Sequence, residues 1–248
     1  FKPNTKAVYI ETPTNPMMEI TDIRALCALA HERNALVIID NTFLSPYFQK
    51  PLTLGADIVV HSGTKFIGGH HDVISGFTIV KDDELAAKLR LTYKTVGACL
   101  SAMDSWLVIR GVKTLALRME QHQKNAIALA EWLKKQPKVT KVLFPGLREH
   151  PGYEINKAQT TGFGGMLSFE VDSEETAKKV LEGIELIQFA ESLGGTESLL
   201  TYPVTQTHPD LKPEDAERKG ITRRLLRLSV GIEDTDDLIA DLEQAFNK

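Results

Sequence analysis

The sequence has few of the features that mark several large classes of protein. Only two of its 248 residues are cysteines, Cys27 and Cys99, and they form no Cys-x-x-Cys pair. This scarcity argues against a disulfide scaffold or a structural zinc site and fits a reducing compartment, so we expect a cytoplasmic protein. No apolar stretch approaches the roughly 18–20 residues that a membrane-spanning helix needs. A membrane partner is therefore not expected.

An excess of basic residues is also missing. Lys and Arg total 29 against 33 Asp and Glu, a formal net charge of −4, and no run rich in Lys or Arg occurs. Nucleic acid is therefore not an expected partner. The composition, 42% hydrophobic and 25% charged, excludes collagen, coiled coil and disorder along the whole chain. A globular protein of one large or two ordinary domains is left.

The first half of the sequence alternates short apolar runs with helical patterns. The runs predict strands at residues 6–11, 35–39, 57–61 and 74–80. Alternation of this kind predicts a parallel sheet with right-handed crossovers. Ligands collect beyond the carboxyl ends of such strands. Asn15, Asp40 and the turn at 62–65, each of which follows a strand, are therefore expected around one crevice.

The second half predicts a separate α/β unit. A long helical pattern runs from Ser101 to about Gln136, with an interruption near Gly111. Beyond it, strands are predicted at 141–144, 165–170, 186–190 and 225–229, and helices at 173–183 and 235–246. We therefore expect a larger domain over residues 1–116 and a smaller α/β domain over residues 117–248.

The most informative segment for chemistry is 60–70, VHSGTKFIGGH. A strand runs into Ser62 and Thr64, hydroxyls on either side of a glycine, and then into Lys65. Hydroxyls and turn N–H groups make a good anion cradle, and a lysine beside them can form a Schiff base with an aldehyde cofactor whose phosphate fills that cradle. The ordinary alternative is a solvated lysine in a polar turn. The spacing does not match that of a nucleotide P-loop.

Asp40 ends an apolar strand on the same side of the predicted sheet. An aspartate in that place is more often a turn or helix cap. With a pyridoxal phosphate cofactor it has a definite task, because a buried carboxylate keeps the ring nitrogen protonated. Other signals are weak: His70, His71 and Asp72 are adjacent and have no spaced partner, so no metal site is predicted.

Five separated segments carry a family resemblance. They are ETPTNP with Asn15, IDNTF with Asp40, HSGTKFIGGH with Lys65, AESLGG with Glu191 and Ser192, and LLRLSVGIED with Arg227. In this order they resemble the Cys/Met-metabolism enzymes that use pyridoxal 5'-phosphate. The resemblance implies an α/β fold of the aspartate-aminotransferase type (fold type I), with a mostly parallel sheet in the cofactor domain and a smaller C-terminal domain.

The resemblance also implies roles for individual residues. Lys65 resembles the lysine that carries the cofactor and moves protons, and Asp40 the partner of the ring nitrogen. Ser62 and Thr64 resemble phosphate ligands. Asn15 lies where the family contacts the cofactor's phenolic oxygen or the substrate.

The remaining matched positions face the substrate in the family. Arg227 resembles the arginine that holds the substrate α-carboxylate, with Ser192 assisting. Arginine suits this task because its planar fork meets a carboxylate with two hydrogen bonds. Without the resemblance, a surface ion pair on a strand would be the preferred interpretation of Arg227. Glu191 resembles a glutamate that faces the distal amino group of cystathionine in γ-lyases and γ-synthases.

The segment 201–208, TYPVTQTH, with Ser105 and Trp106 upstream, most resembles the bacterial cystathionine β-lyase branch. We therefore expect α,β-elimination of cystathionine in methionine biosynthesis and transsulfuration. Cystathionine γ-synthase or γ-lyase activity is the alternative, because Glu191 fits those enzymes. A non-catalytic α/β binding module and a hydrolase that uses the same crevice are more distant alternatives.

The family fold places a further segment ahead of the first predicted strand, close to Phe1. That segment supplies an aromatic ring stacked on the cofactor, a glycine-rich turn and an arm that reaches a neighbouring subunit. We therefore expect the N-terminal part of the family fold to be absent from this chain. We also expect the assembled protein to be a homo-oligomer, a dimer or tetramer.

Overall fold

Four strands from the first third of the chain form one sheet. They are β1 (Ala7–Glu11), β2 (Leu36–Asp40), β3 (Ile58–Ser62) and β4 (Gly76–Val80), in that spatial order. The computed structural model describes the backbone of residues 1–248 and every side chain except that of Pro213. β1, β2 and β3 are parallel, as expected, and their carboxyl ends lie at one edge of the sheet.

The expected parallel arrangement is wrong for the fourth strand. β4 runs antiparallel to β3, with Ser62 opposite Gly76. The helical part of their connection is η2 (Gly63–Ile67), a turn of five residues. The whole connection, residues 63–75, has thirteen residues, and η2 is the one described helix in it, too short to return the chain along the sheet as the crossover helix to a parallel neighbour does. The segment after β3 therefore folds back beside the edge at which β3 ends.

The first sheet is covered on one face by α1 (Ile23–His31) and η1 (Pro51–Leu54), whereas Phe48 of α2 (Ser45–Phe48) belongs to a separate buried cluster with Leu115 and Met119. The Asp22 carboxylate accepts a hydrogen bond from the Ala25 N–H and caps α1. Ile23, Cys27 and Ala30 follow at helical spacing and are buried. Cys27 is therefore a core residue.

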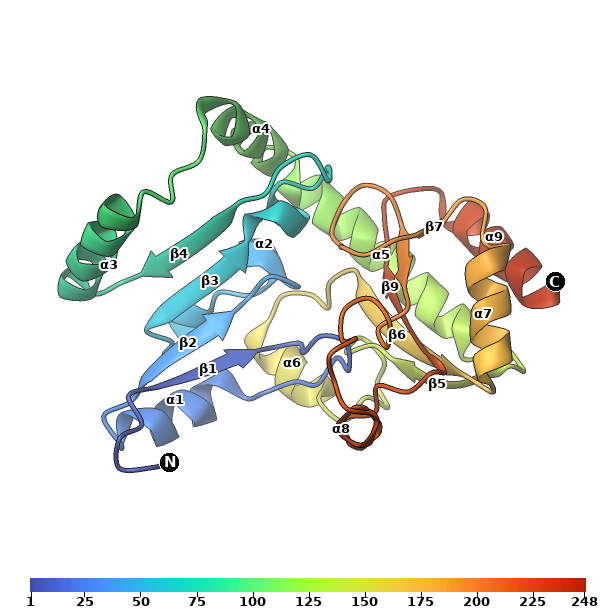
Figure 1. The fold of residues 1–248 in the computed structure, drawn as a ribbon, viewed down its shortest axis with the longest axis horizontal. Coiled ribbons are helices and arrows are strands. Elements are labelled where there is room, and N and C mark those ends of the chain that lie inside the picture. The colour runs from blue at the N-terminus through green and yellow to red at the C-terminus, as the bar shows by residue number, and fades with distance from the viewer.

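Three helices lead from the first sheet to the second half of the chain: α3 (Asp83–Val96), α4 (Ala102–Val112) and α5 (Leu115–Leu133). α4 and α5 are separated at Lys113 and Thr114, close to the predicted interruption. Figure 1 shows α5 crossing from the first sheet to the second. Within the described part of the chain, no helix is long and apolar enough to cross a membrane.

The second sheet contains β5 (Val139–Leu143), β6 (Met166–Val171), β7 (Gln188–Phe189), β8 (Leu199–Thr201) and β9 (Leu225–Ser229), in the order β5-β6-β9-β8-β7. Neighbours are antiparallel except β7 and β8. The helices of this half are α6 (Tyr153–Gln159), α7 (Glu174–Gly183), α8 (Pro213–Arg218) and α9 (Thr235–Asn247). The sequence pattern missed β8, α2 and α6, which are short.

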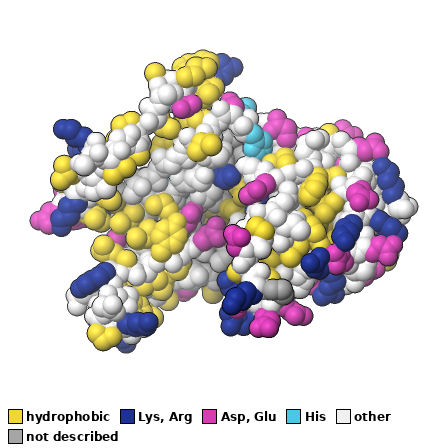
Figure 2. Space-filling view, in the orientation of Figure 1, with side chains coloured by type: hydrophobic (Ala, Val, Ile, Leu, Met, Phe, Trp, Pro, Cys, Tyr) yellow, Lys and Arg dark blue, Asp and Glu magenta, His cyan; other side chains and the backbone are white. Residues whose placement is uncertain are grey.

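The largest buried cluster lies in the second half, where α5, α7 and α9 pack on the sheet through residues such as Phe169, Leu228 and Leu242. In Figure 2, hydrophobic side chains are exposed over the first sheet, whereas charged side chains are scattered over the second half. The two sheets lie on opposite sides of a junction that α5 spans (Figure 1). We keep residues 1–116 and 117–248 as the proposed domains.

Candidate active site

Lys65 lies at the junction between the two sheets. It belongs to η2, directly after β3, and its backbone is non-helical (φ −91°, ψ −129°). Its Nζ donates a hydrogen bond of 3.1 Å to Oγ of Ser192, which is 127 positions further along the chain. Ser192 follows β7 and has a positive φ of 102°, a conformation unfavourable for a residue with a Cβ. The fold therefore brings together two predicted residues that no local pattern connects.

The surroundings of Lys65 favour its neutral form. Burial lowers the pKa of its ammonium group below the ordinary value, and the positive charge of Arg227 lowers it further. The carboxylate of Glu191 acts in the opposite direction and raises this pKa. An amine whose pKa is lowered toward neutrality can accept a proton, as a general base must.

Arg227 is in the middle of β9 and is only 1% exposed. Its Nη1 donates to Oδ1 of Asn15 at 3.0 Å. Its Nη2 donates to the carbonyl of Ser192 at 2.8 Å and to Oγ1 of Thr201 at 3.0 Å. A guanidinium has five N–H donors, so these three bonds leave two for a ligand.

One of the two remaining donors is the Nε–H of Arg227, which is buried and has no partner among the described residues. Burial lowers the pKa of the guanidinium to about 10, so Arg227 stays positively charged at neutral pH. A buried cation with unused donors is costly unless an anion completes it. The site is therefore suited to a carboxylate, and the surface ion pair weighed for Arg227 is wrong.

Asp40 ends β2, beside the end of β3. Its Oδ1 accepts from the N–H of Thr42 at 3.0 Å, and its Oδ2 accepts from the hydroxyl of Tyr9 at 3.1 Å. Burial, followed by the charge of Asp40, raises the pKa of Tyr9 to about 12. The sequence interpretation missed Tyr9. The strand register could have identified Tyr9, because Tyr9 and Glu11 lie on the same face of β1 and Glu11 is paired with Asp40 of β2.

The turn around Lys65 is tied to its neighbours through Ser62 and Thr64. Oγ1 of Thr64 donates to the carbonyl of Ser75 at 3.2 Å and accepts from the Ser75 N–H at 3.0 Å. The N–H of Ser62 donates to Oγ1 of Thr42 at 2.9 Å. The Thr64 hydroxyl would therefore exchange its bond with Ser75 in order to donate to a phosphate.

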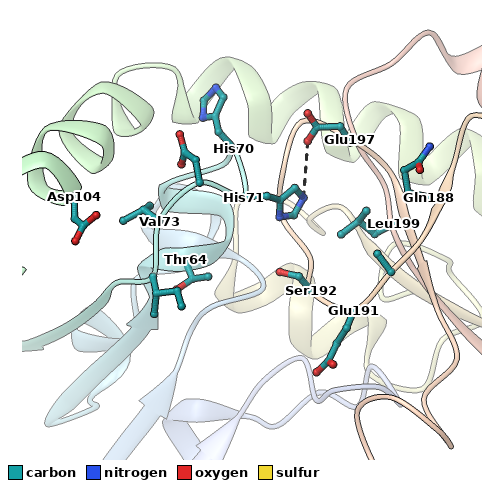
Figure 3. Close-up of a pocket in the computed structure, with 13 residues that line it drawn as sticks. Thr64, His70, His71, Val73, Asp104, Gln188, Glu191, Ser192, Glu197 and Leu199 are labelled. Carbon is teal, nitrogen blue, oxygen red and sulfur yellow. Dashed lines mark ion pairs between the residues drawn. The ribbon is translucent and has the colours of Figure 1, made fainter.

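A groove of about 870 Å³ is lined in part by Thr64 and by Ser192, the residue that accepts the hydrogen bond of Lys65. Figure 3 shows Glu191 and Ser192 at its lower side and His71 pointing toward Glu197 above them. Nε2 of His71 lies 3.9 Å from Oε2 of Glu197. The sequence interpretation missed Glu197 and Asp104, which also line the groove. Neither lies in a recognised motif, and it is the fold that brings each of them to the groove.

A lysine amine with a lowered pKa, a strand-end carboxylate and an arginine with unused donors define the class of site: one that handles an amino acid with the help of an aldehyde cofactor. Pyridoxal 5'-phosphate fits this donor set. Lys65 would carry it, Asp40 would face its ring nitrogen, and Ser62, Thr64 and Asn15 are the other groups that would hold it.

Comparison with known proteins agrees with this class. Residues 1–247 match the model of the family described as Cys/Met metabolism PLP-dependent enzyme, and the chain belongs to that family. The family resemblance and the cofactor predicted from the sequence are thereby confirmed.

Individual relatives carry three different activities. The chain is 51% identical to the cystathionine beta-lyase MetC of Bacillus subtilis and 52% identical to the cystathionine gamma-synthase of Haemophilus influenzae. It covers 100% and 99% of its own length in these matches, but 64% and 62% of the relatives' lengths. The structure of cystathionine gamma-lyase from Lactobacillus plantarum, complexed with L-serine, has a TM-score of 0.97 and 46% identity, with 100% of this chain and 65% of that chain covered. The predicted fold class is confirmed.

Proposed function

We propose that this chain forms the greater part of a pyridoxal phosphate-dependent carbon–sulfur lyase of sulfur amino-acid metabolism. The reaction is α,β-elimination of cystathionine to homocysteine, pyruvate and ammonia. The observation that carries the proposal is the position of Ser192. Its hydroxyl accepts from Lys65 and its carbonyl accepts from Arg227, so one residue joins the proposed base to the proposed carboxylate-binding group.

Arg227 binds the α-carboxylate of the substrate in this proposal. Asn15 and Thr201 hold its two Nη groups, so the guanidinium is oriented before the substrate arrives. Two charge-assisted hydrogen bonds to a carboxylate fix both the position and the rotation of the substrate. The Cα–H bond would thereby be held in a fixed position.

Lys65 removes and returns the proton at Cα. Its lowered pKa makes the neutral amine more available than in an ordinary lysine, and its hydrogen bond to Ser192 fixes the position of the amine. The bound cofactor supplies an electron sink for the negative charge that develops at Cα. Asp40, held by Thr42 and Tyr9, would keep a proton on the ring nitrogen of the cofactor.

The alternative is γ-elimination or γ-replacement, as in cystathionine γ-lyase and γ-synthase. Glu191 favours this alternative, because it lines the groove and its negative charge raises the pKa of both Lys65 and Arg227. A carboxylate there is suited to a distal ammonium group of the substrate. The relatives named above include all three activities at similar identity.

The proposal also includes the assembly and location of the protein, which we expect to be a homo-oligomer, a dimer or tetramer, in the cytoplasm.

Two measurements on the purified holoenzyme test the function. Borohydride reduction followed by peptide mapping is expected to place a pyridoxyl group on Lys65, and a label on Lys94 or Lys113 would contradict the assignment. Products from cystathionine then identify the reaction. Pyruvate with homocysteine indicates β-elimination, whereas cysteine with 2-oxobutyrate indicates a γ-lyase. Formation of cystathionine from cysteine and an O-acylhomoserine indicates a γ-synthase. A protein that takes up no cofactor would be a non-catalytic binding module.

A further inference from the structure

Arg118 is a buried cation of α5 whose recorded contacts are all with uncharged oxygens. The side chain is 3% exposed, and the described residues include no carboxylate paired with it. Burying a guanidinium without an anion is costly, so its contacts must compensate through hydrogen bonds. The partners of these hydrogen bonds indicate which part of the structure Arg118 stabilises.

The bonds of Arg118 converge on the turn that carries Lys65. Nη1 donates to the carbonyl of Phe66 at 2.6 Å, and Nη2 donates to the carbonyl of Ile67 at 3.3 Å. These are the two carbonyls that follow Lys65 directly in the chain. The other bonds anchor the guanidinium to the junction of α4 and α5, with Nη2 donating to the Gly111 carbonyl at 2.9 Å and Nε to Oγ1 of Thr114 at 3.0 Å.

Two glycines show how closely this junction packs against the turn. A Cβ on Gly69, whose φ is +76°, would lie 2.1 Å from Nη1 of Arg118. A Cβ on Gly111 would lie 2.2 Å from the carbonyl oxygen of Gly68. Both distances are far below a normal contact, so the guanidinium and the turn fit together only without side chains at these positions.

The same stripe of α5 also holds the strand that carries Arg227. His122 and Asn125 follow Arg118 at helical spacing, and both are fully buried. Nδ1 of His122 contacts the Val230 carbonyl at 2.7 Å. Nδ2 of Asn125 donates to the carbonyls of Gly231 at 3.1 Å and Glu233 at 2.8 Å. These bonds hold the backbone directly after β9.

We propose that Arg118 is a positioning residue for Lys65, and that Arg118, His122 and Asn125 together set the placement of Lys65 relative to Arg227. Seven residues of helix span about 10 Å, a rigid link between the turn at one end and β9 at the other. Phe66, the neighbour of Lys65, packs edge-on against the His122 ring at 5.2 Å and joins the two ends. The proposal rests on the proposed roles of Lys65 and Arg227.

The test compares Arg118→Met and Arg118→Lys in the holoenzyme with Arg110→Met, which alters an exposed arginine of α4. The readouts are kcat, KM for the amino-acid substrate, and the pH midpoint of the absorbance of the bound cofactor. Arg118→Met is expected to lower kcat about 10- to 100-fold, to move the pH midpoint and to leave KM nearly unchanged. Arg118→Lys is expected to recover part of kcat, and Arg110→Met to match the wild type.

A purely structural role makes a different prediction. If Arg118→Met lowers only thermal stability, with kcat and the pH midpoint unchanged, the proposal is wrong. If that variant does not fold, Thr114→Val serves instead, since it removes one of the four bonds and should move kcat and the midpoint in the same direction by less. An unchanged Thr114→Val enzyme would then overturn the proposal. Pyridoxyl trapping on Lys65 in the wild type separates this outcome from failure of the proposed function.

Discussion

Replacing Arg227 by alanine removes the group proposed to bind the substrate carboxylate. The wild-type guanidinium has two donors left after its bonds to Asn15, Ser192 and Thr201, enough for a two-bond contact in a buried site. Loss of such a charged contact costs about 2–5 kcal/mol. At 1.4 kcal/mol for each factor of ten, kcat/KM should fall between about 30-fold and about 4,000-fold.

The same substitution should also change the pH dependence. Arg227 lowers the pKa of Lys65, so removing the positive charge raises that pKa and moves the acid limb of the kcat/KM profile to higher pH. Arg227→Lys keeps the charge and loses the planar fork. It should therefore lower kcat/KM with a much smaller movement of the acid limb.

The assay is steady-state turnover of cystathionine from pH 6 to pH 10, with urea unfolding to check that each variant is folded. Arg224→Ala is the matched control, because Arg224 is a half-buried arginine just before β9 whose carboxylate contact, to Glu170, is a distant 3.9 Å. It should resemble the wild type. A folded Arg227→Ala enzyme with unchanged kcat/KM and an unmoved acid limb would refute the reasoning.

Three further predictions follow from individual contacts. The asparagine of Asp40→Asn can still accept a hydrogen bond from the Thr42 N–H, but its neutral amide cannot keep the ring nitrogen of the cofactor protonated. Cofactor binding should therefore persist while kcat is largely lost. A kcat near that of the wild type would show that Asp40 has no part in the mechanism. Gly194 and Gly97 both have a positive φ (+78° and +75°), so replacing either by alanine should introduce about 1–2 kcal/mol of backbone strain. The two variants differ in one respect: a Cβ at Gly194 would lie 2.6 Å from the Phe66 nitrogen, whereas a Cβ at Gly97 would have nothing within 4 Å. Gly194→Ala should therefore lose more thermal stability and more activity than Gly97→Ala, and equal losses would contradict this geometry. Burial lowers the pKa of His122 to about 4, from a value near 6.5 in the unfolded chain. The unfolded chain therefore binds a proton more readily between these pH values, and the folded protein should lose on the order of 3 kcal/mol of its free energy of unfolding as the pH falls from 6.5 to 4. His122→Asn should flatten the pH dependence of urea unfolding across this interval, and an unchanged slope would mean that another group titrates.

Much of the local structure can be predicted from the sequence because its causes are local. Strand β9 was predicted with its observed bounds, and the start of α1 follows from Asp22 as the cap and from the spacing of Ile23, Cys27 and Ala30. The residues proposed for chemistry were recognisable for the same reason. Lys65 and Asp40 lie at strand ends in short motifs, where side-chain types and spacing can be interpreted without a structure.

The tertiary structure decided which of these residues meet and in what electrostatic state. Lys65 and Ser192 are 127 positions apart, and Arg227 and Asn15 are 212 apart, so their contacts depend on how two sheets pack across α5. The antiparallel direction of β4 depends on how the chain after Lys65 folds back. The contact of Tyr9 with Asp40 depends on strand register. The lowered pKa of Lys65 arises from burial and from the positive charge of Arg227 on β9. The residues next to Lys65 in the sequence determine neither cause, because desolvation and Coulomb interactions act through space and not along the chain.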